Sequence, residues 1–182
     1  MFFKRKSSAF KEFFAFAGAE DQKNINSVEQ FLDKYEGCTL LDGMYRLFKK
    51  QDVEKWNRIV GRAFPPAMGK VQVFGYDWQG RVFAIFKETD TVLILEPGTG
   101  EAFDTEKDFC EFHNVALPAD HAFCLQSTTY KEWRQTDNSD IAHNQCVSYI
   151  IPLFLGGKDE IENLELSDME VYWTIMTPLI NE

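Results

Sequence analysis

The chain has 182 residues and a formal net charge of −10, with 45% hydrophobic and 15% aromatic residues. At roughly 100 to 200 residues per domain, this length predicts one domain, and the composition supplies a core that a disordered chain would lack. The excess of acids repels a phosphate backbone, and no basic run offsets it, so no nucleic-acid partner is expected.

The start of the chain differs in composition from the rest. We expect a Phe-rich helical arm over residues 1–26 and a single α+β domain over residues 27–182. The start resembles a secretory signal, but Lys11 and Glu12 interrupt the apolar stretch that such a signal requires. Nowhere do 18 apolar residues run together, so we expect a cytoplasmic protein with no membrane-spanning segment.

The arm itself has a helical pattern with three open interpretations. Phe10, Phe13, Phe14 and Ala17 fall on one helical face. Such a face docks on the domain core, touches a membrane surface or serves as a dimerisation arm. Of these, docking on the core is the commonest case, and we expect no membrane partner.

Two amphipathic helices and a strand are expected before residue 70. Ser27-Val28-Glu29-Gln30 has the spacing of a capping box, so a helix starts there, and Gly37 ends it. Residues 40–48 predict a strand. Apolar residues at three- and four-residue intervals from Val53 to Val60 predict a second helix, which ends before Phe64-Pro65-Pro66 because the residue before a proline disfavours helix.

The middle of the chain is rich in strand patterns. Apolar runs over residues 71–74, 82–86 and 91–95 are separated by short polar turns that contain Gly or Asp. This spacing predicts an antiparallel meander. The run from Glu96 to Glu101 closes the meander as a turn.

The last third of the sequence mixes helices and strands. Helices are expected from Thr105 to the residue before Pro118, and over residues 120–133. Residues 146–155 predict a buried strand and residues 163–166 a short second one, and the capping-box spacing Ser167-x-x-Glu170 starts a last helix. The predicted fold class is α+β: a mixed or antiparallel β-sheet, with the meander in the middle, flanked by about four or five helices.

Sequence signatures of catalysis and metal binding are missing. The sequence contains no Gly-x-Ser-x-Gly elbow, no His-Glu-x-x-His helix and no dinucleotide fingerprint. Gly156-Gly157-Lys158 imitates part of a phosphate loop, but two acids follow it. The four cysteines form no Cys-x-x-Cys pair, which favours free thiols over a zinc site. We expect no enzyme activity, no cofactor and no metal.

An alternative function stays open beside this expectation. A small-molecule-binding domain, or an enzyme of unknown reaction, would need an aromatic-lined pocket with a few polar groups. The residues that would supply this candidate pocket are Asp77, Trp78, Arg81, Glu96 and His113.

Acids are concentrated near the C-terminus. Residues 153–182 contain seven acids and one base, Lys158. Such a field raises the association rate of a basic partner, and Tyr172 and Trp173 are of the type that anchors interfaces. The run equally fits a solvated face, and the two aromatics fit a core. The acids expected to contact a partner are Asp159, Glu160, Glu162, Glu165, Asp168 and Glu170.

Several stretches resemble a known family. Through these stretches, residues 27–180 resemble a family of small bacterial proteins. That family is similar to the C-terminal domain of type VI secretion immunity proteins. The stretch from Gly43 to Phe48 is similar to a strand of that domain that contains a glycine, an aromatic residue and an arginine. The stretches that carry the resemblance are Phe74-Gly75-Tyr76-Asp77-Trp78-Gln79-Gly80-Arg81, Leu95-Glu96-Pro97-Gly98-Thr99-Gly100-Glu101, Pro152-Leu153-Phe154-Leu155-Gly156-Gly157, Glu162-Asn163-Leu164-Glu165 and Asp168-Met169-Glu170-Val171-Tyr172-Trp173.

The resemblance implies binding rather than catalysis. Immunity proteins of this kind neutralise antibacterial effectors, nucleases among them. A weaker similarity in size, charge and aromatic middle links the chain to the SUKH superfamily of acidic immunity and regulatory proteins. We therefore expect an immunity-like domain over residues 27–182, monomeric or homodimeric, that neutralises a basic toxin or effector through an acidic surface.

Overall fold

The structure, a computed structural model, describes residues 9–19, 25–137 and 139–182. Its centre is a six-stranded sheet in the order β1-β2-β3-β4-β5-β6, and each neighbouring pair is antiparallel. Strand order follows chain order, so the predicted meander is confirmed and extends to both edges. The strands are β1 Thr39–Leu40, β2 Tyr45–Leu47, β3 Val71–Asp77, β4 Val82–Phe86, β5 Thr91–Glu96 and β6 Glu101–Asp104.

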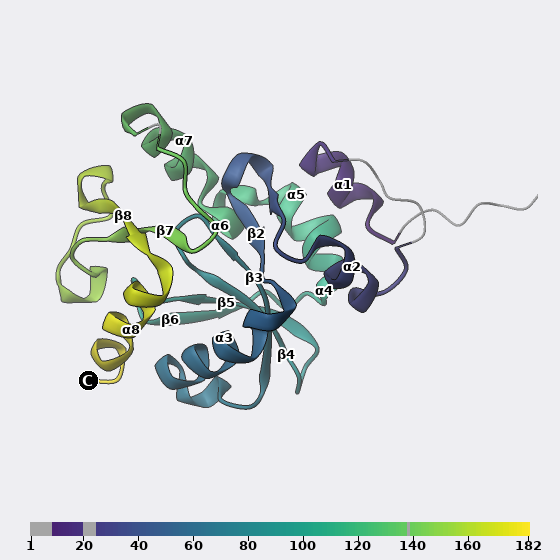
Figure 1. The fold of residues 1–182 in the computed structure, drawn as a ribbon, viewed down its shortest axis with the longest axis horizontal. Helices are drawn as coiled ribbons and strands as arrows, with labels where there is room; N and C mark the ends of the chain where they lie inside the picture. The colour runs from purple at the N-terminus through teal and green to yellow at the C-terminus, as the bar shows by residue number, and fades with distance from the viewer. Residues whose placement is uncertain (1–8, 20–24, 138) are drawn as a thin grey trace, which may run out of the picture.

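Helices pack on both faces of this sheet (Figure 1). Alternate strand residues face opposite sides, so Phe83 and Ile94 join one apolar cluster while Val82 and Leu95 join the other. The first cluster lies under α1 Lys11–Ala17, α2 Val28–Tyr35 and a helical stretch made of α4 Phe109–Glu111, the π-helical turn Phe112–Ala116 and α5 Leu117–Ala119. The second lies under α3 Lys50–Ala63 and α8 Met169–Ile180. The predicted α+β class is confirmed.

The remaining two strands form a second, smaller sheet. β7 Gln145–Tyr149 and β8 Leu164–Asp168 form an antiparallel pair. The helices α6 His121–Leu125 and α7 Ser127–Thr136 precede this pair, and α8 follows it. Figure 1 shows α7, β7, β8 and α8 gathered at one side of the molecule, away from α1 and α2. We call α6 to α8, residues 121–180, the C-terminal segment.

The described part of the N-terminal arm belongs to the core. Phe10, Phe13 and Phe14 are at most 1% exposed. Their rings pack against Phe31 with centroid distances of 4.6, 5.7 and 6.0 Å. Docking on the core is therefore the arrangement that the structure adopts for these residues, while residues 1–8 and 20–24 lie outside the described part. In the described ranges, no helix has the length and apolar character needed to cross a membrane.

The two helices predicted before residue 70 are confirmed as α2 and α3. Ser27 Oγ accepts from the backbone N–H of Gln30 at 3.2 Å, as the capping spacing predicted. The single strand predicted over residues 40–48 is wrong. Leu41, Asp42 and Gly43 have φ angles of 53°, 54° and 101°, which no strand permits, so the turn η1 Leu41–Gly43 separates β1 from β2.

The helices after β6 have other limits than predicted. α4 begins at Phe109 rather than near Thr105, because Asp108 and Glu111 form the capping box. Helical backbone continues past Pro118, since a proline is tolerated in a first helical turn. Gln126 has a φ of 47°, so it divides the helix predicted over residues 120–133 into α6 and α7.

The strands and helix of the C-terminal segment are confirmed with corrected ends. The strand predicted over residues 146–155 ends at Tyr149, because the side chain of Asn163 takes up both backbone groups of Ile151, at 2.9 and 2.8 Å. Asp168, and not Ser167, caps α8 by accepting from the backbone N–H of Val171 at 3.0 Å. The Ser167 hydroxyl instead hydrogen-bonds to Ser148 across the smaller sheet at 2.6 Å.

Candidate functional site

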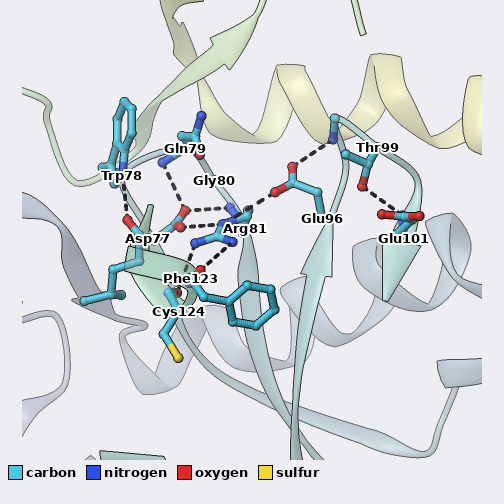
Figure 2. Close-up of polar contacts among 12 residues, drawn as sticks. Asp77, Trp78, Gln79, Gly80, Arg81, Glu96, Thr99, Glu101, Phe123 and Cys124 are labelled. Atoms are coloured by element: carbon cyan, nitrogen blue, oxygen red, sulfur yellow. Dashed lines mark hydrogen bonds and ion pairs between the residues drawn. The ribbon is translucent and has the colours of Figure 1, made fainter. Parts of the chain in front are cut away.

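A tight turn between β3 and β4 joins the C-terminal segment to the large sheet (Figure 2). Asp77 accepts from the backbone N–H groups of Gln79 and Arg81, each at 3.0 Å. The chain reverses through Gly80, whose φ of 79° favours glycine. A Cβ atom there would lie 2.9 Å from Sγ of Cys146 on β7, so the glycine also lets the smaller sheet approach.

Three charged side chains are buried at this turn. Arg81 Nε lies 2.6 Å from Oδ2 of Asp77 and 3.4 Å from Oε2 of Glu96. Figure 2 shows Arg81 between these carboxylates and the backbone of Phe123 and Cys124, whose carbonyls accept from its Nη atoms at 3.3 and 3.0 Å. All three charged side chains are nearly inaccessible to solvent. We call Asp77, Arg81 and Glu96 the buried charge cluster; its charges are compensated inside the protein.

Glu96 is the member of the cluster with a pKa near neutrality. Burial raises the pKa of its carboxyl group to about 7, although Arg81 opposes the change. Oε1 accepts from the backbone N–H of Gly98 at 3.1 Å. Such a pKa suits proton transfer, but Glu96 is only 6% exposed, and its contacts are with Arg81 and the backbone of Gly98.

Two indole groups extend the same junction to both ends of the C-terminal segment. Trp78 Nε1 donates to the carbonyl of Leu125 in α6 at 2.9 Å. Trp173 Nε1, on α8, donates to the carbonyl of Gly80 at 2.8 Å. The C-terminal segment is therefore fixed to the β3–β4 turn at α6, at β7 and at α8.

Four of the five residues of the predicted candidate pocket meet at this junction, and the fifth does not. Asp77, Trp78, Arg81 and Glu96 lie around the turn, where each is at most 6% exposed. His113 lies in the aromatic cluster under α1 and α2, where Nε2 is 2.8 Å from the hydroxyl of Tyr45. Burial lowers the pKa of His113 to about 3, so this imidazole is neutral. In this conformation none of the five offers an open surface to a ligand.

An open groove lies between the smaller sheet and α8. Its volume is about 390 Å³, and its walls combine apolar side chains with the carboxylates of Glu165 and Asp168. Val171 and Ile175 are one helical turn apart and are 56% and 57% exposed, and Ile150 across from them is 51% exposed. We call this hollow, with its lining residues Ile150, Glu165, Asp168, Val171 and Ile175, the C-terminal groove.

The groove lies in the most apolar part of the described surface. Of the ten large hydrophobic side chains that are exposed among the described residues, seven fall between Ile150 and Ile175. Exposed apolar side chains that gather in one region, with polar residues around them, mark interaction sites. Sequence reasoning missed these residues. The available signal was that α8 is apolar on nearly every side, whereas a helix docked by one face has a polar opposite face.

All six acids predicted to contact a partner are exposed, but three have structural roles. Asp168 caps α8 and also accepts from Nδ2 of Asn144 at 3.1 Å. Glu170 pairs with Lys55 of α3 at 2.8 Å, and Asp159 accepts from the hydroxyl of Tyr149 at 2.9 Å. The remaining acids are Glu160, 3.8 Å from Lys158, together with Glu162 and Glu165. Tyr172 and Trp173 are core residues, so they cannot anchor a partner here.

Comparison with known proteins points to the same segment. Residues 120–179 match the family described as "T6SS immunity protein Tdi1, C-terminal". This match confirms the predicted resemblance to type VI secretion immunity proteins, over a shorter range than residues 27–180. It spans α6 to α8 and so contains the whole C-terminal groove.

A solved structure shares the fold. A protein of Agrobacterium tumefaciens, described as "Crystal structure of Atu4351 from Agrobacterium tumefaciens", aligns with a TM-score of 0.61 at 15% sequence identity. The alignment covers 82% of this chain and 74% of that chain, and at this identity it shows the fold alone. A search of curated proteins finds no match to the chain.

Proposed function

We propose that the protein is a non-catalytic, immunity-type protein that neutralises a cognate toxin or effector by binding it at the C-terminal groove. The observation that carries the proposal is that three features lie in the same stretch of the chain. The stretch that matches an immunity family also holds the groove and most of the exposed large hydrophobic side chains of the described surface. A family likeness and an exposed apolar region each favour a protein partner at this segment.

The groove supports a partner of defined chemistry. An apolar side chain of the partner would fill the hollow between Ile150, Val171 and Ile175, with roughly 25 cal/mol gained per Å² of apolar surface removed from water. Lysine and arginine side chains of the partner would lie near Glu162 and Glu165, which raise the association rate. The expected partner is therefore a basic protein with a protruding apolar residue.

The buried charge cluster supports a role without catalysis. Its carboxylates and guanidinium are charged groups of the kind that catalytic sites use, yet they are closed to solvent and pair with one another and with the backbone of α6. The four cysteines are free thiols, which fits action in the reducing cytoplasm, as a monomer or a homodimer.

A pull-down with matched variants tests the interface. Val171→Arg places a positive charge at the groove, and Val115→Arg places the same charge on the π-helical turn, where Val115 is 54% exposed against 56% for Val171. From lysate of the source cells, the wild type and Val115→Arg are expected to capture one basic protein. Val171→Arg should retain about tenfold less of it, a loss of ~1.4 kcal/mol, with an unchanged melting temperature.

Growth protection then tests neutralisation itself. The captured protein, expressed alone, should stop growth of a bacterial host. Co-expression of the wild type or of Val115→Arg should restore growth, and Val171→Arg should not. A captured protein that is harmless when expressed alone would contradict the immunity function, and full protection by Val171→Arg would contradict the groove as its site.

A further inference from the structure

A second hollow lies near β2, outside the C-terminal groove. Its volume is about 480 Å³, and the turn η1, helix α7 and the chain before β7 form its walls. Its charged lining residues are Arg46, Arg134, Asp42 and Asp140, and Tyr130 and Thr39 add hydroxyl groups. Neither the buried charge cluster nor the proposed function uses these groups.

Arg46 is a buried guanidinium with most of its donors unused. It is 2% exposed, and Nη2 donates to the carbonyl of Ile141 at 3.1 Å. Nε and Nη1 have no hydrogen-bond partner among the described residues. No carboxylate of the described part of the chain forms an ion pair with Arg46, and the ring of Tyr76, 6.0 Å away, supplies only a weak attraction.

The physical cost of this arrangement is large. A guanidinium in a protein stays charged and carries five N–H donors, and a buried charge without a counterion costs several kcal/mol. Arg81, in the turn before β4, shows the compensated alternative, with two carboxylates and two carbonyls around it. Arg46 has one carbonyl, so an acceptor with negative charge would complete its surroundings.

The hollow reaches the guanidinium of Arg46 at Gly43. A Cβ atom on Gly43 would lie 3.6 Å from Nη2 of Arg46 and 3.0 Å from the hydroxyl of Tyr130. The glycine therefore leaves this edge of the guanidinium uncovered by a side chain. Ile141, whose carbonyl accepts from the same Nη2, also lines the hollow.

A second guanidinium and two carboxylates define what would fit. Arg134 is half-buried; its Nη1 donates to the carbonyl of Ser139 at 2.6 Å, and its guanidinium lies 5.8 Å from the ring centroid of Trp133. Asp42 and Asp140 are exposed and would repel a polyanion, whereas they would attract a cationic group. Charges of both signs therefore face one hollow.

We infer that this hollow binds a small zwitterion, with its carboxylate or phosphate held by Arg46 and Arg134 and its ammonium group near Asp42 and Asp140. Guanidinium groups recognise both oxyanions through their N–H donors, here Nη2 of Arg46 beside Gly43 and the guanidinium of Arg134. The hollow is separate from the C-terminal groove, so binding of a small ligand can be tested independently of binding of the protein partner.

Isothermal titration calorimetry with three small probes tests the site. β-Alanine and O-phosphoethanolamine each carry an ammonium group beside a carboxylate or a phosphate, and ethanolamine lacks the oxyanion. We expect saturable binding of one of the first two with a dissociation constant of about 1 mM or below, which corresponds to ~4 kcal/mol, and none of ethanolamine. The probe that binds identifies the oxyanion.

Variants connect any binding to the two arginines. Arg46→Gln should abolish binding, and Arg134→Gln should weaken it about tenfold. Since Arg46→Gln changes a buried position, Arg134→Gln keeps the test decisive if the first variant fails to fold. Arg62→Gln, on the exposed side of α3, is the matched control and should bind as the wild type does. Absence of binding by both zwitterions, equal binding of ethanolamine, or unchanged binding in Arg134→Gln would overturn the inference.

Discussion

Two pairs of carboxylates in this protein have different surroundings. Asp77 and Glu96 lie beneath the C-terminal segment, whereas Glu162 and Glu165 lie on its surface. The first pair is buried around Arg81. Its oxygens form ion pairs with Arg81 and also accept hydrogen bonds from backbone N–H groups. The second pair is exposed and has no ion pair among the described residues. Removing the partner of a buried charge costs several kcal/mol, whereas exposed charges contribute little to stability.

The two pairs of carboxylates therefore have different roles, which the overall acidic composition does not distinguish. The buried pair holds Arg81, which donates to the carbonyls of Phe123 and Cys124 in the C-terminal segment. The exposed pair contributes little to the fold, so it is free to act on a partner. Changes at the two places should therefore produce different kinds of defect, one in stability and the other in binding.

The largest effect is expected at Arg81. Arg81→Met would leave Asp77 and Glu96 buried without their counterion, so the free energy of unfolding should fall by about 3–5 kcal/mol. Urea denaturation measures it. Arg58→Met is the matched control, because the Arg58–Glu54 pair is 63% and 83% exposed and its loss should cost at most ~0.5 kcal/mol. Equal losses in both variants would show that the buried cluster does not hold the fold.

The next effect concerns the apolar part of the groove. Ile175→Ala should weaken binding of the captured partner by about 2 kcal/mol, chiefly through faster dissociation, with little change in stability. Surface plasmon resonance measures both rates. Met68→Ala is the control, since Met68 is 56% exposed near the end of α3, against 57% for Ile175, and should bind normally. An unchanged dissociation rate for Ile175→Ala would remove this side chain from the interface.

A smaller effect is expected from the exposed acids. Glu162→Lys/Glu165→Lys should slow association about tenfold and flatten its dependence on salt, because it removes an attractive field. Asp168 is left in place, since it caps α8 and its loss would cost about 1 kcal/mol of stability. Glu12→Lys/Glu106→Lys changes the net charge equally at exposed positions elsewhere. Equal slowing by both double variants would reduce the effect to overall charge.

A separate effect is a pH dependence of the free energy of unfolding that comes from Glu96. Its pKa is raised to about 7 in the folded protein, from an ordinary value of 4.5, so the folded state holds this proton more tightly than the unfolded state does. The contribution of Glu96 is therefore fully present below pH 4.5 and is lost as the pH rises through 7. At ~1.4 kcal/mol per pKa unit, we expect the free energy of unfolding to decline by up to about 3 kcal/mol across this window.

Glu96→Gln isolates that dependence from the other titrating groups. His113 has a lowered pKa of about 3, so its contribution changes in the opposite sense, declining as the pH falls below its ordinary value of 6.5. The difference between wild type and Glu96→Gln in urea titrations from pH 4.5 to 8 should carry the slope of Glu96 alone. Parallel curves would contradict the raised pKa.

Patterns along the sequence predicted the elements that depend on local chemistry. Alternating apolar runs located the meander, and the Ser27 cap located α2. The prediction of one strand over residues 40–48 was wrong because Leu41 and Asp42 adopt positive φ angles, which their residue types do not predict.

The candidate sites depend on distant parts of the chain, so the sequence predicted them only in part. Asp77, Arg81 and Glu96, which were predicted to line one pocket with Trp78 and His113, lie together in the structure, but the carbonyls of Phe123 and Cys124 that close the cluster lie more than 40 residues after Arg81. Val171 and Ile175 were not among the predicted partner-binding residues, and the packing of α8 leaves both exposed while it buries Tyr172, Trp173 and Met176.

Amide hydrogen exchange of the complex with the captured toxin tests the proposed interface most directly. Binding at the C-terminal groove should slow exchange in β8 and at the start of α8, from Leu164 to Ile175, while α1 and α2 exchange as in the free protein. Protection confined to other parts of the chain, with β8 and α8 unchanged, would contradict the groove as the site of neutralisation.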